Sequence, residues 1–259
     1  MKRLTILLTF GFRDAYRKVA EWLRRHPWDL LFLDLPKESE PFIKACAEKK
    51  ATAIEFWRSY GLLTGLAEPF VNSLRLRFQS ILESIRNAHL RGREIRCYRD
   101  LKSYIDEKKM LERIFLLEFR YQVTGRLEVE EWKGILCREM ETAGDTWNRA
   151  VERILEEAEP NSRNTVLYGG HLESTNRLRR PDTELEVILL EDYWKSPLDI
   201  LRTLLWRHGT DKISDERIES YLKLQKKYLD LVIGSKDVDE AHRAWTHMIQ
   251  RTIIPAPPE

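Results

Sequence analysis

The first 36 residues constrain the fold most, because two short apolar segments flank an amphipathic helix pattern. Residues 4–9 and 30–35 have the apolar composition of buried strands. Residues 15–25 carry apolar side chains at helical spacing, and Pro27 ends that pattern. A strand, a helix and a second strand within about 35 residues form the signature of a β–α–β unit. The chain is therefore expected to build a parallel sheet.

Three later segments repeat the strand pattern, and helical spacing fills most of the chain between them. The further strands are predicted at residues 94–98, 165–168 and 185–190. Helices are predicted at residues 15–25, 38–50, 69–91, 197–207, 214–232 and 237–249, while residues 51–57 fit either a strand or a helix end. We expect an α/β fold, with a mainly parallel sheet of five or more strands and helices on both faces.

The chain is predicted to form a single α/β domain over residues 1–254. Two long helical regions, 101–124 and 129–159 with a break near Gly144, are expected to form a helical insertion at about residues 101–159. The last two strands must rejoin the first three to bury their faces, so we do not divide the chain into two domains. Residues 255–259, rich in proline, are expected to fray.

Charge and composition limit the classes of partner. The 44 basic and 42 acidic residues leave a net charge of +2, which gives no overall reason to bind nucleic acid but leaves open a local basic patch. No apolar run approaches the roughly 18 residues that a membrane span needs, and no signal peptide is recognised. The 33% of charged residues are typical of thermophile ion-pair networks or of solvated helix faces.

The three cysteines indicate a reducing, cytoplasmic environment. Cys46, Cys97 and Cys137 are widely spaced, without a CxxC motif or a paired histidine, which argues against a structural zinc site. Each is expected to be a small packed residue.

Ligands of open parallel sheets bind beyond the carboxyl ends of the strands, and one turn at such an end contains a histidine. Gly169 and Gly170 follow the fourth predicted strand and allow a sharp turn into His171. His171 is the strongest candidate for a metal ligand or general base. The alternative is a turn whose histidine caps the next helix.

Two aspartates follow the first two predicted strands. Asp14 and Asp34 could bind a metal ion or activate water, so we name Asp34 with His171 as catalytic and Asp14, Asp34 and His171 as metal ligands. Alternatively, Asp14 is a helix N-cap and Asp34 accepts a hydrogen bond from a backbone amide. If strands one, two and four are neighbours, these three side chains should face a common cleft.

Further candidates could hold an anionic ligand or cofactor at the same ends. Gly11 and Arg13 follow the first strand, although they form no dinucleotide or P-loop fingerprint. Arg99 follows the third strand and could bind an anion bidentately, or pair with a carboxylate such as that of Asp100. With Gly169 and Gly170, these residues make up the predicted cofactor-binding set.

The order of these segments resembles the TraB/TIKI group, which is related to ChaN and erythromycin-esterase-like proteins. That group has a GxxH turn, a strand carrying an acid, a DR-type motif and a late GxGH. The matching stretches are residues 7–14, 29–35, 96–100 and 166–171. Asp14 stands where the group has histidine, Asp34 where it has glutamate and Tyr168 where it has glycine. The resemblance implies a metal-dependent hydrolase whose metal ligands are Asp14, Asp34 and His171.

Two functions therefore stay open. The first is a divergent TraB/TIKI-like hydrolase of a small-molecule or peptide substrate, with one histidine and two aspartates suited to Mn²⁺ or Mg²⁺. The second is a non-catalytic ligand-sensing or interaction module that binds a nucleotide or other anion through Arg13, Arg96 and Arg99 at the same edge. Convergence of the acids with His171 would favour the hydrolase, and an arginine-lined pocket would favour the module. Self-association is left open for both.

Overall fold

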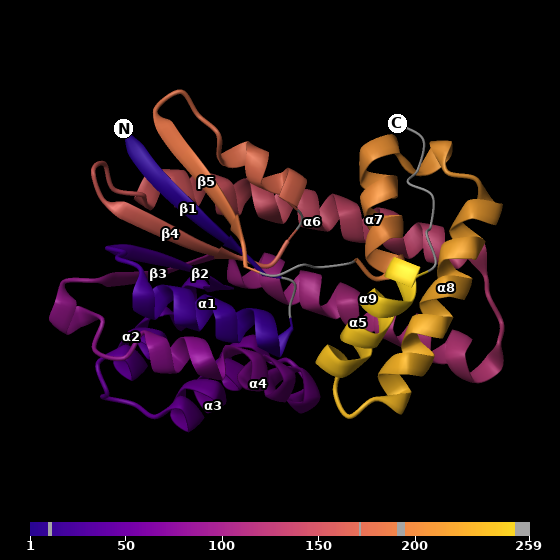
Figure 1. Cartoon of the computed structure of the whole chain (residues 1–259), viewed down its shortest axis with the longest axis horizontal. Helices are drawn as coiled ribbons and strands as arrows, with labels where there is room; N and C mark the ends of the chain where they lie inside the picture. Colours follow the sequence, from indigo (N-terminus) through magenta and orange to yellow (C-terminus); the bar gives the residue numbers. More distant parts are fainter. Residues whose placement is uncertain (10–11, 171, 191–194, 252–259) are drawn as a thin grey trace. The chain divides into compact units, whose positions relative to one another are not determined.

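The computed structural model describes residues 1–9, 12–170, 172–190 and 195–251. Five parallel strands form one sheet in the order β3-β2-β4-β1-β5 (Figure 1). They are β1 (Lys2–Leu8), β2 (Leu30–Pro36), β3 (Glu94–Arg99), β4 (Arg163–Tyr168) and β5 (Thr183–Leu189). The predicted α/β fold with a parallel sheet is confirmed.

The strand order brings together the carboxyl ends of the strands that precede the predicted site residues. Strands β2, β4 and β1 are direct neighbours, so the segments that follow them leave the sheet at adjacent positions of its carboxyl edge. β3 lies beside β2, and its end joins the same edge. This adjacency is the condition under which we expected residues far apart in the sequence to converge.

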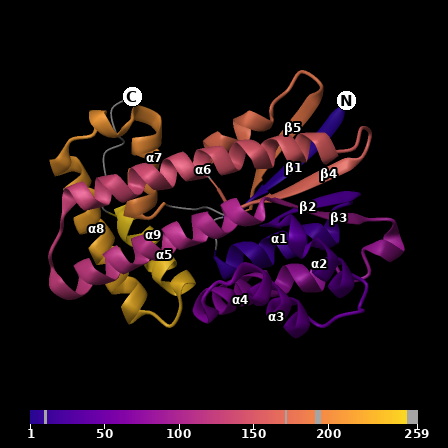
Figure 2. The same cartoon turned by 180° about the vertical axis from the view of Figure 1, so that it is seen from behind.

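Helices cover both faces of the sheet (Figures 1 and 2). One face carries α1 (Arg13–Arg25), α2 (Glu40–Ala47), α3 (Ala53–Thr64) and α4 (Glu68–Ser84). The other is covered by the C-terminal part of α6 (Val129–Glu157). The remaining helices are α5 (Leu101–Thr124), α7 (Pro197–His208), α8 (Asp215–Gly234) and α9 (Val238–Arg251). Short 3-10 turns lie at Lys37–Ser39, His89–Arg91, Leu172–Leu178 and Thr210–Lys212.

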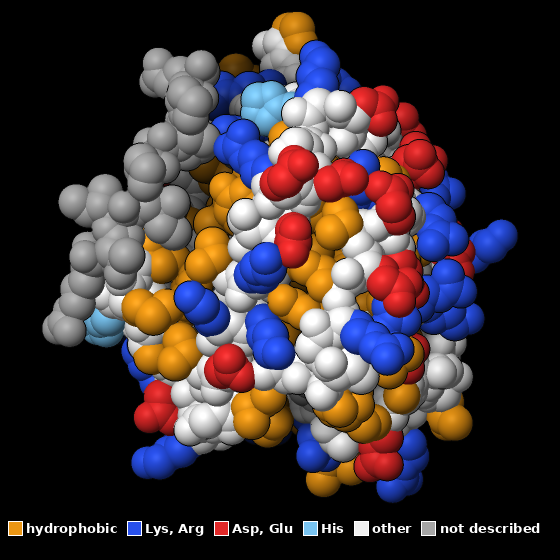
Figure 3. Space-filling view, turned by 90° about the vertical axis from the view of Figure 1, so that its right-hand side faces the viewer, with side chains coloured by type: hydrophobic (Ala, Val, Ile, Leu, Met, Phe, Trp, Pro, Cys, Tyr) orange, Lys and Arg blue, Asp and Glu red, His pale blue; other side chains and the backbone are white. Residues whose placement is uncertain are grey.

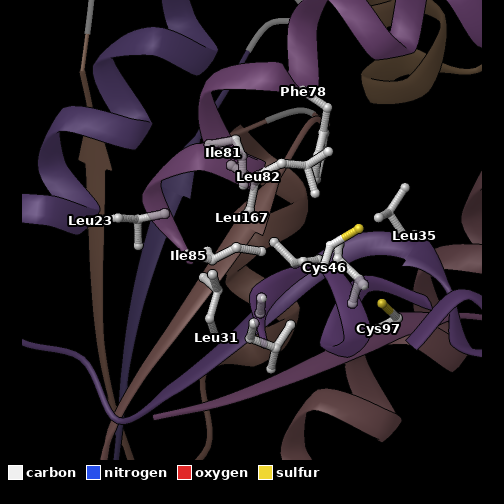
Figure 4. Close-up of a cluster of buried hydrophobic side chains, with 14 of the residues drawn as sticks. Leu23, Leu31, Leu35, Cys46, Phe78, Ile81, Leu82, Ile85, Cys97 and Leu167 are labelled. Carbon is white, nitrogen blue, oxygen red and sulfur yellow. The ribbon is translucent and has the colours of Figure 1, made fainter. Parts of the chain in front are cut away.

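Alternate strand residues enter two separate cores. Leu31 and Leu33 point into the layer of α1 to α4, and Leu30 and Phe32 point into the layer of α6. This alternation is the two-residue period of a strand that is buried on both faces. Figure 4 shows the first core, in which Cys46 and Cys97 pack among leucine and isoleucine side chains. The prediction of packed cysteines is confirmed for these two, and Cys137 is half-buried.

Two local predictions are decided by capping and packing. Residues 53–57 form the start of a helix, because Thr52 and Glu55 make the capping box at which α3 begins. The predicted break near Gly144 is wrong, since α6 continues through it. A single helical glycine costs only about 1 kcal/mol relative to alanine, and α6 buries Trp147 and Ile154 just beyond it.

The contacts divide the chain into two compact units. Unit 1 comprises residues 1–109 and 141–192 and holds the sheet, and unit 2 comprises residues 110–140 and 193–259. The two long helices of the predicted insertion are present, and each contributes residues to both units. The described part of unit 2 is helical and has its own apolar cluster around Trp132, Leu201 and Leu222. Residues 255–259, predicted to fray, lie outside the described residues.

A buried ion-pair group accompanies the apolar cluster of unit 2. The Arg202 guanidinium donates to Glu139 at 2.8 Å and to Asp199 at 3.0 Å. Gln225 donates to Glu118 at 2.7 Å, so Arg202 and Gln225 both have hydrogen-bond partners in this unit. None of the helices within the described ranges has the length and apolarity to cross a membrane.

Candidate functional site

Three charged side chains meet at the carboxyl edge of the sheet in unit 1. Arg99 ends β3 and donates from one terminal nitrogen to Asp34 Oδ1 at 2.6 Å, across from neighbouring β2. Its other terminal nitrogen donates to Glu107 on α5, the helix that follows β3 directly. We call Asp34, Arg99 and Glu107 the edge triad.

The edge triad is largely withdrawn from water. The exposed fraction is 7% for the Arg99 side chain, 19% for Asp34 and 21% for Glu107. Removing charges from water is costly, and the mutual attraction of buried ions often only balances that cost. A group of this kind therefore contributes little net stability and needs another explanation.

Tyrosines from the surrounding helices form the wall beside Arg99. Its guanidinium carbon lies 5.5 Å from the centre of the Tyr104 ring, and Lys108 Nζ lies 4.7 Å from the same centre. Tyr60 donates a hydrogen bond of 2.8 Å to the Tyr104 hydroxyl. The positive charges are thus held against an aromatic face by cation–π attraction as well as by carboxylates.

The ion pairs hold Arg99 and Glu107 in their charged forms. Burial alone would raise the pKa of Glu107, but Arg99 and then Lys108 outweigh it and lower that pKa to about 2. Burial alone would lower the pKa of Arg99, but Glu107 and then Asp34 raise it well above its usual value. Glu107 and Arg99 are therefore charged at every physiological pH.

One donor of Arg99 is unused. Within the described residues, Arg99 Nε is buried and has no hydrogen-bond partner. Each of its two terminal nitrogens donates to a carboxylate, so among the described residues Nε is the one guanidinium nitrogen without an acceptor.

The two predicted glycines also lie at this edge, and each tolerates no large side chain. A Cβ on Gly169 would lie 3.4 Å from Asp34 Oδ2 and 3.8 Å from Thr9 Oγ1, so β4, β2 and β1 converge here. A Cβ on Gly170 would overlap the hydroxyl of Tyr168, whose ring stacks on Trp147 at 4.1 Å. Gly169 therefore places no side chain against Asp34 Oδ2.

Two further predicted residues lie in the first turn of α1. Asp14 is the second residue of α1 and pairs with Arg17 at 3.1 Å; the N-cap is Phe12, so the alternative of an Asp14 cap is wrong. Arg13 is exposed at the start of α1. Gly11 and His171 lie outside the described residues.

The metal-site prediction is therefore not decided by this geometry. In the described ranges, His, Cys, Asp and Glu side chains nowhere gather in threes at metal-binding positions. Asp34, the central predicted ligand, has Arg99 as its partner rather than a backbone amide. The convergence of Asp14, Asp34 and His171 stays a prediction, because His171 is not among the described residues.

The two arginines of β3 have separate partners. Arg99 pairs with carboxylates, as the alternative held, but these belong to Asp34 and Glu107. Asp100, the named example, accepts hydrogen bonds from Ser103 instead. Arg96 lies within 4 Å of carboxylates of Glu40, Glu94 and Glu157. Of these two candidate anion-binding arginines, only Arg99 belongs to the edge triad.

Sequence reasoning missed the contribution of α5. Two charged residues of α5, Glu107 and Lys108, lie three and four residues after Tyr104. This spacing puts both of them on the same helix face as Tyr104. Because α5 begins just after β3, that face had to adjoin the end of the sheet. The helical spacing of Glu107 from Tyr104, in the helix that follows Arg99, was the signal that could have identified Glu107.

Comparison with protein-family models, curated proteins and solved structures gives no match. The relationship to the TraB/TIKI group stays a prediction, and the function has to be argued from the edge triad itself.

Glu107 should make stability depend on acid pH. Its pKa lies below the ordinary value of 4.5, so its stabilising effect is complete above pH 4.5 and is lost as pH falls towards about 2. A shift of this size corresponds to a loss on the order of 3 kcal/mol. Urea unfolding measured across this range should show a shallower pH dependence for Glu107→Gln than for wild type. Glu130→Gln is the control, because the Glu130 side chain is 81% exposed; equal slopes for wild type and Glu107→Gln would contradict the role of the triad.

Proposed function

We propose that the chain binds a small anionic ligand at the carboxyl edge of its sheet, with Arg99 as the residue that holds it. The observation that carries this proposal is the buried Arg99, held by two carboxylates with one donor unused. Open parallel sheets usually bind their ligands at this carboxyl edge.

The energetics of the edge triad support a binding role. Apolar side chains of similar volume would stabilise such a position equally well or better. Buried charged groups with strongly perturbed pKa values occur preferentially at functional sites, although structural networks also contain them. The charges of Asp34, Arg99, Glu107 and Lys108 sum to zero, so the group does not repel an anion overall.

The geometry indicates how the ligand would be held. An oxygen of a phosphate or carboxylate group could accept a hydrogen bond from Arg99 Nε, and such charge-assisted bonds are about twice as strong as neutral ones. The glycines of the β4 turn would let the ligand approach beside Asp34. Arg99 would be preorganised, since the two carboxylates and the Tyr104 ring already hold its guanidinium.

Inorganic phosphate is the simplest probe of this proposal. Isothermal titration of the full chain should detect phosphate binding, and Arg99→Lys should weaken it at least about tenfold because lysine lacks the planar set of donors. Arg96→Lys, a change of the same kind on the same strand, should leave the affinity unchanged. Circular dichroism would establish that both variants fold.

A second variant keeps the test independent of the ion pairs. Gly169→Ala adds one methyl group in ordinary contact with Asp34 and should preserve the fold while weakening phosphate binding. Phosphate binding that is absent in wild type, or unaffected by both Arg99→Lys and Gly169→Ala, would refute the proposal.

A metal-dependent hydrolase is the second candidate, favoured by the position of Gly169. This residue begins the Gly-Gly-His turn and adjoins Asp34 Oδ2, the oxygen that is not bonded to Arg99. Asp34 and His171 would be first choices as ligands, and a bound divalent ion would supply an activated water. The described residues do not form a complete ligand set, so this candidate depends on His171.

Metal content distinguishes the second candidate from the first. Protein purified without chelator and titrated with Mn²⁺ alone should bind about one equivalent if the hydrolase reading is right, with His171→Ala and Asp34→Asn each reducing affinity at least about tenfold. Asp182→Asn, at the opposite edge of the sheet, is the control. Absence of Mn²⁺ binding would leave only the anion-binding function.

A further inference from the structure

The amino edge of the same sheet carries a second group of charged side chains, remote from the edge triad along the strands. The amino ends of β4, β2 and β3 are joined there by backbone hydrogen bonds: Asp29 N donates to Arg163 O at 3.0 Å, and Glu94 N donates to Asp29 O at 2.7 Å. Arg91 and Arg93 immediately precede β3, and Arg163 begins β4. These bonds bring three arginines from distant parts of the sequence to one place in unit 1.

Carboxylates balance the positive charge of this place only in part. Arg163 is held by Asp29, with contacts of 2.6 Å and 3.0 Å. Arg91 and Arg93 have no carboxylate at ion-pair distance within the described part of the chain. The other acids nearby are engaged elsewhere: Glu94 pairs with Arg96 at 2.6 Å, and Glu159 accepts a hydrogen bond from Ser162 at 3.2 Å.

The arginines are close enough to repel one another. Burial lowers the pKa of Arg93 first, and the charges of Arg91 and Arg163 lower it further, whereas the charge of Asp29 raises it. Arg93 is nevertheless fixed in position, with its guanidinium carbon 4.7 Å from the centre of the Trp28 ring. An anion placed here would relieve this repulsion.

The last turn of α1 extends the basic surface and adds an aromatic ring. Arg24 and Arg25 are exposed and have no carboxylate at ion-pair distance among the described residues. They precede His26, whose ring stacks on that of Trp22 with centroids 4.5 Å apart and planes 10° apart. His26 is exposed, so its outer ring face is open to a further planar group.

We propose that this arginine edge, comprising Arg24, Arg25, Arg91, Arg93 and Arg163, binds the phosphate backbone of a single-stranded nucleic acid. Guanidinium groups pair with phosphates bidentately, and sequence-tolerant binding of single strands combines such positive surfaces with rings on which bases stack. His26 provides such a ring, and only an unpaired base can stack on it. A net charge of +2 for the whole chain does not oppose this, because a local basic surface can bind phosphates whatever the overall charge. On the face drawn in Figure 3, acidic and basic side chains are interspersed.

Fluorescence anisotropy with a labelled single-stranded RNA of about 12 nucleotides tests the proposal on the full chain. Each phosphate contact adds about −0.7 to the slope of log K against log salt concentration. The double variant Arg91→Gln, Arg93→Gln should therefore bind more weakly and show a slope smaller in magnitude by about 1.4. His26→Ala should weaken binding while leaving the salt slope unchanged, since it removes stacking rather than charge.

The controls separate this surface from general charge effects and from misfolding. Arg58→Gln with Arg75→Gln removes the same charge from exposed positions on α3 and α4 and should leave binding unchanged. Because Arg93 contacts Trp28, the single change Arg91→Glu at an exposed position provides a variant that spares this contact and should also weaken binding. No RNA binding, equal losses in the α3–α4 control, or binding to phosphatidylserine vesicles in place of RNA would overturn the proposal.

Discussion

The sheet of unit 1 has to bury both of its faces, and most of the structure follows from this requirement. Successive residues of β2 enter different cores, so helices must cover both sides. The buried central strands of such a sheet can present polar groups only at their two ends, where strands give way to helices and turns. The edge triad lies at the carboxyl end and the arginine edge at the amino end.

Burying the three charges of the edge triad costs free energy, and the fold holds each of them in a specific position. Its side chains come from β2, β3 and α5, and Arg99 is oriented by two carboxylates and an aromatic ring together. The apolar side chains around them make every charge–charge interaction stronger than in water, and the same environment would penalise any member that lost its partner. A rigid arginine with an unused donor is the kind of preorganised group that binds an anion without first being ordered.

The sequence predicted the strands that carry this site better than the ion pairs within it. Apolar runs located all five strands, and the rule about carboxyl ends selected Asp34, Arg99 and Gly169 before their geometry was known. It did not predict that Asp34 and Arg99 would pair, because strand order follows from long-range packing that local patterns do not encode.

Other errors also have identifiable physical causes. Gly144 looked like a helix break, yet tertiary packing of α6 overrides a penalty of about 1 kcal/mol. Glu107 was not predicted because its role depends on the direction in which α5 leaves β3. An Asp14 cap was an alternative because the sequence does not fix the start of α1 to one residue.

The central claim is that the edge triad is there for binding rather than for stability, and its free energy of unfolding tests this most directly. Urea unfolding would compare wild type, Arg99→Met, and a triple variant in which Asp34→Leu, Arg99→Met and Glu107→Leu are combined. Arg99→Met should lose about 3–5 kcal/mol by stranding two buried carboxylates, whereas the triple variant should match or exceed wild-type stability. A triple variant as unstable as Arg99→Met would show that the charges themselves hold the fold together, and would contradict the account.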